Sequence, residues 1–160
     1  MPRGRPREFD IDQALDRALE VFWRKGYEGT TLPDLTRAMG INRPSLYAAF
    51  GNKEALFRRV IDRYVEGPAA FFSEALTEPR ARAVAERLLR GTIDTVTAPN
   101  GPRGCLIVQG ALACSEAAES VRRELAARRS AGEAAIRARF ERAKADGDLP
   151  ADSDPADLAR

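Results

Sequence analysis

The sequence predicts an all-α protein, and three observations support this fold class. Apolar residues recur at spacings of three and four over most of the chain, as in helices that bury one face. Helix-capping residues precede these segments, and Gly or Pro follows them. Apart from residues 105–114, no segment is a strand candidate. The 160 residues are 44% hydrophobic and 31% charged, so we expect one or two small domains with a core.

The composition argues against several classes of function. The chain has no His, and Cys105 and Cys114 are nine positions apart, so no Cys/His zinc site and no Ser-His or Cys-His catalytic pair can be built. We expect no metal, no cofactor and no enzyme, although carboxylate chemistry stays open. No uncharged apolar run reaches about 18 residues, and the N-terminus lacks the apolar core of a secretion signal. We therefore expect a cytoplasmic protein that does not enter a membrane.

The first helix is expected to begin at Asp10 and to end just before Gly26. Asp10 and Gln13 have the spacing of a capping box, and Gly26 suits the left-handed residue that ends a helix. One apolar stripe runs between them, formed by Ile11, Ala14, Leu15, Ala18, Leu19 and Phe22. We interpret Trp23 and Tyr27 as core or edge aromatics; the alternative is that they stack on bases.

A helix-turn-helix pattern follows the first helix. Thr31 can cap a second helix, and Gly40 ends it. Asn42 can cap a third helix, which Gly51 stops after barely two turns. Two helices joined by a three-residue turn that contains Gly form a helix-turn-helix.

The third helix is too short to be stable alone, so packing must hold it in place. Leu46 and Phe50 are four residues apart and can face inward. The outer side then carries Arg43, Pro44, Tyr47 and Ala48. We expect this small polar face to contact a partner; the alternative is a connector helix in a bundle.

A basic segment precedes the first helix. Arg3, Arg5 and Arg7 are separated by Gly and Pro, so they form an arm that cannot pack into a core. Such arms reach along DNA backbones or into minor grooves. The alternative is a solubilising tail.

Several elements occur together between residues 9 and 64, where the central part reads GTTLPDLTRAMGINRPSLYAAFGNKEALFRRVIDRY. They are Gly26 before Tyr27, the pair Thr30 and Thr31, the turn Gly40-Ile41, the run Ser45-Leu46-Tyr47, Phe50 and Lys53. Together they resemble the DNA-binding domain of the TetR/AcrR family of bacterial transcriptional regulators. The resemblance covers about a third of the chain.

The resemblance implies which residues contact DNA. The third helix would enter the major groove with Arg43, Pro44, Ser45, Ala48 and Ala49 toward base edges. Arg43 is the candidate for a bidentate contact to guanine. Phosphates would be held by Tyr47, Lys53, Thr30 and Thr31, with Arg3 and Arg5 from the arm. Many relatives carry bulkier side chains at positions 48 and 49, so here direct readout would involve fewer groups, with methyl contacts to thymine.

Further helices are expected after the third. A long one starts at Asn52 and is interrupted at Gly67-Pro68, which is either a boundary between two helical portions or a surface kink. Apolar periodicity predicts helices over residues 80–97 and 120–144, and a new helix starts at Asp154. Residues 105–114 could form a buried strand or helix, and helix is favoured because no other strand exists.

The family resemblance implies that the later helices form a domain for ligand binding and dimerisation. Candidate pocket residues are Phe71, Phe72, Leu88, Thr92, Thr95, Cys105, Ile107 and Gln109, although an apolar core would produce the same set. Cys105 follows a Gly at an expected helix start, where a thiolate is favoured, so it is either an electrophile sensor or a small core residue. No disulfide to Cys114 is expected.

The sequence thus predicts an arm with a helix-turn-helix DNA-binding domain in residues 1–52 and a helical regulatory domain in residues 53–160. Family members continue with two more helices, so we expect the second domain to be C-terminally incomplete. The expected function is a ligand-responsive repressor that binds a palindromic operator in double-stranded DNA as a homodimer and responds to an unknown small-molecule effector. The alternative is a helical protein-interaction module without DNA binding.

Overall fold

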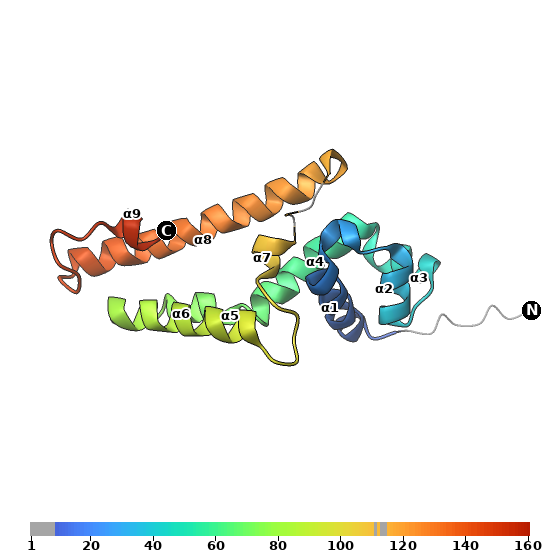
Figure 1. Cartoon of the computed structure of the whole chain (residues 1–160), viewed down its shortest axis with the longest axis horizontal. Helices are drawn as coiled ribbons and strands as arrows, with labels where there is room; N and C mark the ends of the chain where they lie inside the picture. The colour runs from blue at the N-terminus through green and yellow to red at the C-terminus, as the bar shows by residue number, and fades with distance from the viewer. Residues whose placement is uncertain (1–8, 111, 113–114) are drawn as a thin grey trace, which may run out of the picture.

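The computed structural model describes residues 9–110, 112 and 115–160, and all regular structure in that part of the chain is helical. The helices are α1 (Ile11–Gly29), α2 (Leu32–Met39), α3 (Arg43–Phe50), α4 (Lys53–Glu66), α5 (Ala70–Ala75), α6 (Ala81–Thr97), α7 (Leu106–Gln109), the 3-10 turn η1 (Glu116–Ala118), α8 (Glu119–Ala145) and α9 (Pro155–Leu158). In Figure 1, α1 to α4 gather at one end of the molecule, and α8 runs from there toward the other end above α5 and α6. The expected contacts of Arg3 and Arg5, and the position of Cys114, lie outside the described residues.

The capping residues predicted for the first four helices are confirmed. Thr31, Asn42 and Asn52 each accept a hydrogen bond from the backbone N–H three residues further on, at 3.2, 2.8 and 2.8 Å. Asp10 accepts likewise from the N–H of Gln13, at 3.1 Å. These side chains satisfy donors that have no partner within their own helix. The helix starts are therefore encoded locally in the sequence.

Two glycines shape the turns around α2. Gly26 has φ 71° and ψ 175°, which breaks the helical geometry of α1, as predicted, before a last turn that runs to Gly29. Gly40 has φ 68° and ψ 29°, the left-handed conformation of a C-cap. A side chain at either position would be strained. The helix-turn-helix is thus set by one Gly on each side of α2.

The first of two apolar cores lies among α1 to α4 and includes residues of α7 and α8. Its buried side chains are Ala14, Leu15, Ala18, Leu19, Phe22, Leu35, Met39, Leu46, Phe50, Leu56, Phe57, Val60, Ile61, Tyr64, Leu106, Val121 and Leu125. Trp23 and Tyr27 are partly buried against this core, which confirms their interpretation as core or edge aromatics. The ring of Trp23 meets that of Tyr64 edge-on at 4.8 Å. Helix α4 therefore packs with the helices that precede it.

The second core is smaller and joins α6 to the far end of α8. Its buried side chains are Ala81, Val84, Phe140 and Ala143. Helix α6 forms where periodicity predicts it, but only one end of its apolar stripe is covered. Leu89 and Ile93 are 66% and 57% exposed. Helix α6 therefore presents apolar side chains to solvent.

The interruption after the fourth helix is confirmed. Helix α4 ends at Gly67, whose N–H donates to the carbonyl of Arg63, and the short α5 begins three residues later. The long helix expected over residues 120–144 is present as α8. Asp154 caps α9 by accepting from the N–H of Ala156 at 2.9 Å, as the sequence predicts.

The expected helix over residues 105–114 is wrong in length. Helix α7 spans only Leu106–Gln109, and Gly110 is its C-cap. The carbonyl of Gly110 accepts a hydrogen bond from the N–H of Tyr27 in α1, at 3.2 Å. This long-range bond fixes the end of α7 against α1.

Among the described residues, none of the helices combines the length and the apolar character needed to cross a membrane.

Candidate nucleic-acid interface

Helix α3 presents a polar face because two side chains anchor its other side. Leu46 and Phe50 are 0% and 4% exposed, as predicted from their spacing. On the opposite side Arg43, Pro44, Tyr47 and Ala48 are exposed, and Ser45 and Ala49 are partly buried. Ala49 packs against the first core, so less of its side chain is available to a partner. The five residues predicted to meet base edges therefore lie on one helix, and three of them, Arg43, Pro44 and Ala48, are exposed.

Arg43 and Tyr47 lie one turn apart on this face and contact each other. The guanidinium of Arg43 lies 5.8 Å from the centre of the Tyr47 ring, and Tyr47 is 42% exposed. A guanidinium held over an aromatic face keeps its N–H donors free in the plane of the group. Together the two side chains offer a bidentate donor and a hydroxyl on one surface.

The start of α2 carries the predicted threonines, but the two differ. Thr31 is exposed, and its hydroxyl donates to Asp34 at 2.8 Å within a capping box. Thr30 is 1% exposed, and its hydroxyl donates to the carbonyl of Gly26 at 2.7 Å. The hydroxyl of Thr30 therefore holds the turn together. Only Thr31 presents its side chain at this helix N-terminus.

The carboxylate of Asp34 lies beside Thr31 and is held by two partners. Lys25 pairs with Asp34 at 2.8 Å. The hydrogen bond from Lys25, followed by those from the backbone and hydroxyl of Thr31, lowers the pKa of Asp34 well below its usual range. Asp34 would repel a phosphate, and the ammonium of Lys25 offsets that charge. The role of Lys25 was not predicted; its place just before Gly26 is the only signal in the sequence.

Lys53 opens α4 with its side chain folded over an aromatic ring. Its ammonium lies 4.5 Å from the centre of the Tyr27 ring. A cation at a helix N-terminus is unfavourable for the helix dipole, and the cation–π contact compensates for part of this cost. The position suits a residue that meets an anion.

A further cation, Arg59, lies beside α3 and was not predicted. Its guanidinium lies 4.9 Å from the centre of the Phe50 ring and donates to the carbonyl of Ala49 at 3.4 Å. Arg59 belongs to α4, two turns after its start, so only the packing of α3 on α4 brings it here. A sequence pattern could not reveal this proximity.

Five of the predicted pocket residues lie on α5 and α6. They are Phe71, Phe72, Leu88, Thr92 and Thr95. Phe71 packs so closely on Gly91 that a Cβ at that glycine would lie 2.2 Å from its ring. The hydroxyl of Thr95 contacts the carbonyls of Gly91 and Pro68, at 2.8 and 3.2 Å. Phe71 also lines a surface cleft of about 470 Å³ along α5 and α6.

The other three predicted pocket residues lie on α7 or at its start. Cys105 is partly buried, and its sulfur accepts a hydrogen bond from the hydroxyl of Tyr64 at 3.4 Å. Burial, and then the contact with Cys105, raises the pKa of Tyr64. The carbonyl of Ile107 accepts from Arg129 of α8 at 2.9 Å, and Gln109 is exposed. The eight residues therefore divide between two places, and their role in ligand binding stays a prediction.

The described residues contain no group of three or more His, Cys, Asp or Glu side chains that could hold a metal ion.

Comparison with known protein families gives two matches, one in each half of the chain. Residues 14–60 match the model of bacterial regulatory proteins of the tetR family. Residues 79–160 match the tetracyclin repressor-like C-terminal domain. The chain is also 35% identical, over 159 residues, to the HTH-type transcriptional repressor ComR of Escherichia coli K12; the match covers 98% of this chain and 76% of ComR.

The chain belongs to the TetR family. It is 37% identical over 110 residues to the repressor BdcR of Escherichia coli K12, a match that covers 67% of this chain and 55% of BdcR. Its fold also matches a solved structure of a TetR family member. A cysteine-substituted variant of the regulator CifR, in complex with operator DNA of 26 base pairs, aligns with a TM-score of 0.90 and 47% identity, over 97% of this chain and 82% of that one.

Membership of the TetR family makes the chain a transcriptional regulator and not an enzyme. It also decides between the two functions that the sequence left open, because this family binds DNA through a helix-turn-helix. The regulator is supported, and the protein-interaction module without DNA binding is not.

Proposed function

We propose that this TetR family member is a repressor that binds a palindromic operator as a homodimer and releases it when a small molecule binds the later helices. The observation that carries the proposal is the polar face of α3, where Arg43, Tyr47 and Ala48 are exposed while Leu46 and Phe50 anchor the helix. The complex of CifR with operator DNA and the repressors ComR and BdcR support it. The protein would act in the cytoplasm, where its operator lies.

The proposed DNA contacts are of two kinds, those that recognise bases and those that bind phosphates. Arg43 reads a base, with Ser45, Pro44 and Ala48 beside it, while Ala49 contributes least because it is partly buried. Tyr47, Thr31 and Lys53 hold phosphates, as do the backbone at Thr30 and the arm residues Arg3 and Arg5. In the dimer the two α3 helices would enter successive major grooves, roughly 34 to 36 Å apart.

The proposed domain division is residues 1–52 for DNA and residues 53–160 for regulation. Helix α4 lies in the first core and leads directly to α5, so a change among the later helices has a rigid path to α3. An effector lowers DNA affinity only if it prefers the conformation that does not bind DNA. The proposed pocket comprises Phe71, Phe72, Leu88, Thr92, Thr95, Cys105, Ile107 and Gln109.

The test is operator binding by wild type and by Arg43→Ala, measured against a pool of DNA sequences at several salt concentrations. We expect wild-type affinity to fall steeply with salt and Arg43→Ala to lose discrimination of about 1 to 3 kcal/mol at one base pair per half-site. Arg90→Ala, a change at an exposed arginine of α6, is the matched control. An unchanged base preference in Arg43→Ala would remove Arg43 from the reading role, and salt-independent binding would contradict the proposal as a whole.

A further inference from the structure

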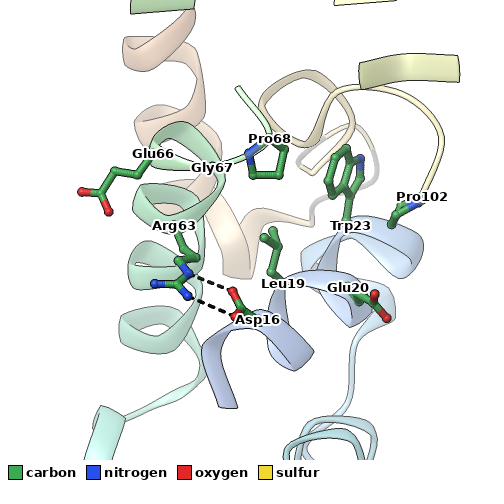
Figure 2. A pocket seen from close by; sticks show the side chains of 9 residues that line it. All are labelled: Asp16, Leu19, Glu20, Trp23, Arg63, Glu66, Gly67, Pro68 and Pro102. Carbon is green, nitrogen blue, oxygen red and sulfur yellow. Dashed lines mark hydrogen bonds and ion pairs between the residues drawn. The ribbon is translucent and has the colours of Figure 1, made fainter. Parts of the chain in front are cut away.

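A half-open cleft of about 610 Å³ lies where α1, the end of α4 and the loop before α7 meet. It contains none of the predicted pocket residues. Figure 2 shows its apolar wall: the ring of Trp23 stands between Pro68 and Pro102, with Leu19 beneath it. The three walls come from segments far apart in the sequence, so a local sequence pattern could not predict the cleft.

The ring of Trp23 is held rigidly in this wall. Its indole N–H donates to the carbonyl of Gly104 at 2.8 Å, and its edge-on contact with Tyr64 has an interplanar angle of 88°. The polar atom of the indole is therefore already satisfied, and what remains for a ligand is apolar and aromatic surface. An indole face attracts cations more strongly than the other aromatic side chains do.

The charged groups that line the cleft are predominantly negative. Asp16, Glu20 and Glu66 contribute carboxylates, and Arg63 contributes the guanidinium. Arg63 is already paired: its Nε and one terminal nitrogen donate to Asp16 at 2.8 and 3.0 Å, and the other terminal nitrogen contacts Asp12 at 3.2 Å. Figure 2 shows the guanidinium directed at Asp16. Its positive charge is therefore largely neutralised.

Glu20 and Glu66 carry the remaining charge. Neither forms an ion pair with any cation of the described residues at 4 Å or less. In Figure 2, Glu20 lies below Trp23 and Pro102, and Glu66 lies on the outer side of α4. The carboxylate of Glu66 is directed away from Trp23, so Glu20 is the carboxylate beside the apolar wall. Glu66 interacts electrostatically with Arg63, and the lining still has more negative than positive groups. A net negative lining beside an aromatic face attracts a positive charge and repels an anion.

We propose that this cleft binds a small organic cation, with its apolar body against Trp23, Pro68 and Leu19 and its positive charge toward Glu20, while Glu66 adds negative charge at the rim. A hydrated metal ion fits less well, because the described carboxylates do not gather into a metal-binding group. Substituted ammonium compounds combine the two required properties, a positive charge and an apolar surface. The site is distinct from the proposed effector pocket and does not depend on DNA binding.

Trp23 makes the proposal directly testable, because it is the only tryptophan in the chain. The experiment titrates the full chain, without DNA, with benzyltrimethylammonium and follows tryptophan fluorescence. Phenylethanol and phenylacetate serve as neutral and anionic probes of similar size. With benzyltrimethylammonium we expect a saturable change in fluorescence and a dissociation constant on the order of 1 mM. Phenylethanol should bind more weakly than this cation, and phenylacetate more weakly still.

The matched variants remove two charges at different places. Glu20→Gln with Glu66→Gln should weaken benzyltrimethylammonium binding about tenfold. Asp146→Asn with Asp152→Asn removes the same charge at the far end of α8 and should leave binding unchanged. Thermal melts establish that both variants are folded. The proposal is overturned if benzyltrimethylammonium gives no saturable change, if a neutral or anionic probe binds as tightly, or if the two double variants bind alike. None of these outcomes bears on the DNA-binding function.

Discussion

Lys53 is held in place by interactions with residues outside its own helix, Tyr27 and Glu28. Its ammonium lies at the N-terminus of α4, where the helix dipole disfavours a cation. The contact with the Tyr27 ring holds it there at 4.5 Å. A side chain whose charge does not help its own helix, and which is nevertheless fixed in position, suits an external anion such as a phosphate.

Replacement of Lys53 by Ala should therefore weaken DNA binding while leaving the protein folded. We expect about a tenfold loss of affinity for every sequence and a salt slope reduced by about 1 per protomer, because one phosphate contact disappears. Filter binding or fluorescence anisotropy at several salt concentrations measures both. A thermal melt should show that the variant is folded, with only the small loss of stability expected from the missing cation–π contact. A sequence-dependent loss would instead assign Lys53 to base readout.

The stability of the folded protein should depend on pH through the carboxyl group of Asp34. Its pKa is lowered in the folded protein, mainly by Lys25 and then by Thr31. A carboxyl whose folded pKa lies below its unfolded value, about 3.9, stabilises the fold above that value, and the contribution is lost as the pH falls toward the folded pKa. The stabilising form of Asp34 is thus the charged one.

The melting temperature of wild type should exceed that of Asp34→Asn at neutral pH, and the difference should shrink below about pH 4. Melts followed by circular dichroism across this range check the expectation. Asp152→Asn, which changes an exposed carboxylate outside the capping box, is the control and should show little difference at any pH. A gap between wild type and Asp34→Asn that stays constant into acid would contradict the assignment.

Helix starts could be predicted from the sequence because their determinants are local. Thr31, Asn42 and Asn52 cap the helices that they precede, and Gly40 ends α2 as expected. The length of helix α7 was overestimated; the carbonyl of its C-cap Gly110 accepts from the N–H of Tyr27, a contact with a distant segment that no local pattern could reveal. At the candidate interface the helix-turn-helix and the outer face of α3 were predictable. The burial of Thr30 and the approach of Arg59 to α3 were not, because both result from packing between helices.

Gly91 of α6 and Gly132 of α8 both lie inside helices, but their surroundings differ. The same substitution at each position should reveal this difference. A Cβ at Gly91 would lie 2.2 Å from the ring and 2.8 Å from the Cβ of Phe71, so α5 and α6 would have to separate. A Cβ at Gly132 would lie 3.4 Å from the nearest atom of Phe72, an ordinary contact. Close packing of α5 on α6 therefore requires Gly at position 91 only.

We expect Gly132→Ala to stabilise the protein by up to about 1 kcal/mol through helix propensity. Gly91→Ala should destabilise it by about 1 to 3 kcal/mol, because overpacking outweighs the same propensity gain. Urea unfolding of the two variants, with wild type alongside, measures both free energies. Equal effects of the two substitutions would show that α5 is free to move away from α6.

At the scale of the whole molecule, the two cores are unequal. The first collects side chains from α1 to α4 and from α7 and α8, including fully buried aromatics such as Phe22 and Phe57. The second joins only α6 and the end of α8, and it leaves Leu89 and Ile93 exposed. Ion pairs also join α8 to α4, where Arg128 pairs with Asp62 at 2.7 Å. Such partly exposed pairs contribute little compared with apolar burial.

Local stability should therefore fall from α4 to α6. Regions with few buried apolar contacts open at a lower free energy than the global value, and their amides exchange faster. Hydrogen exchange followed by mass spectrometry should show slow exchange in α4, around Val60 and Ile61, and faster exchange in α6 around Leu89 and Ile93. Phe140→Ala should accelerate exchange in α6 while leaving α4 nearly unchanged, because Phe140 belongs only to the second core. Equal acceleration of amide exchange in α4 and α6 would mean that the two cores unfold as one cooperative unit. A change among the later helices would then reach α3 through global unfolding and not through movement of α4.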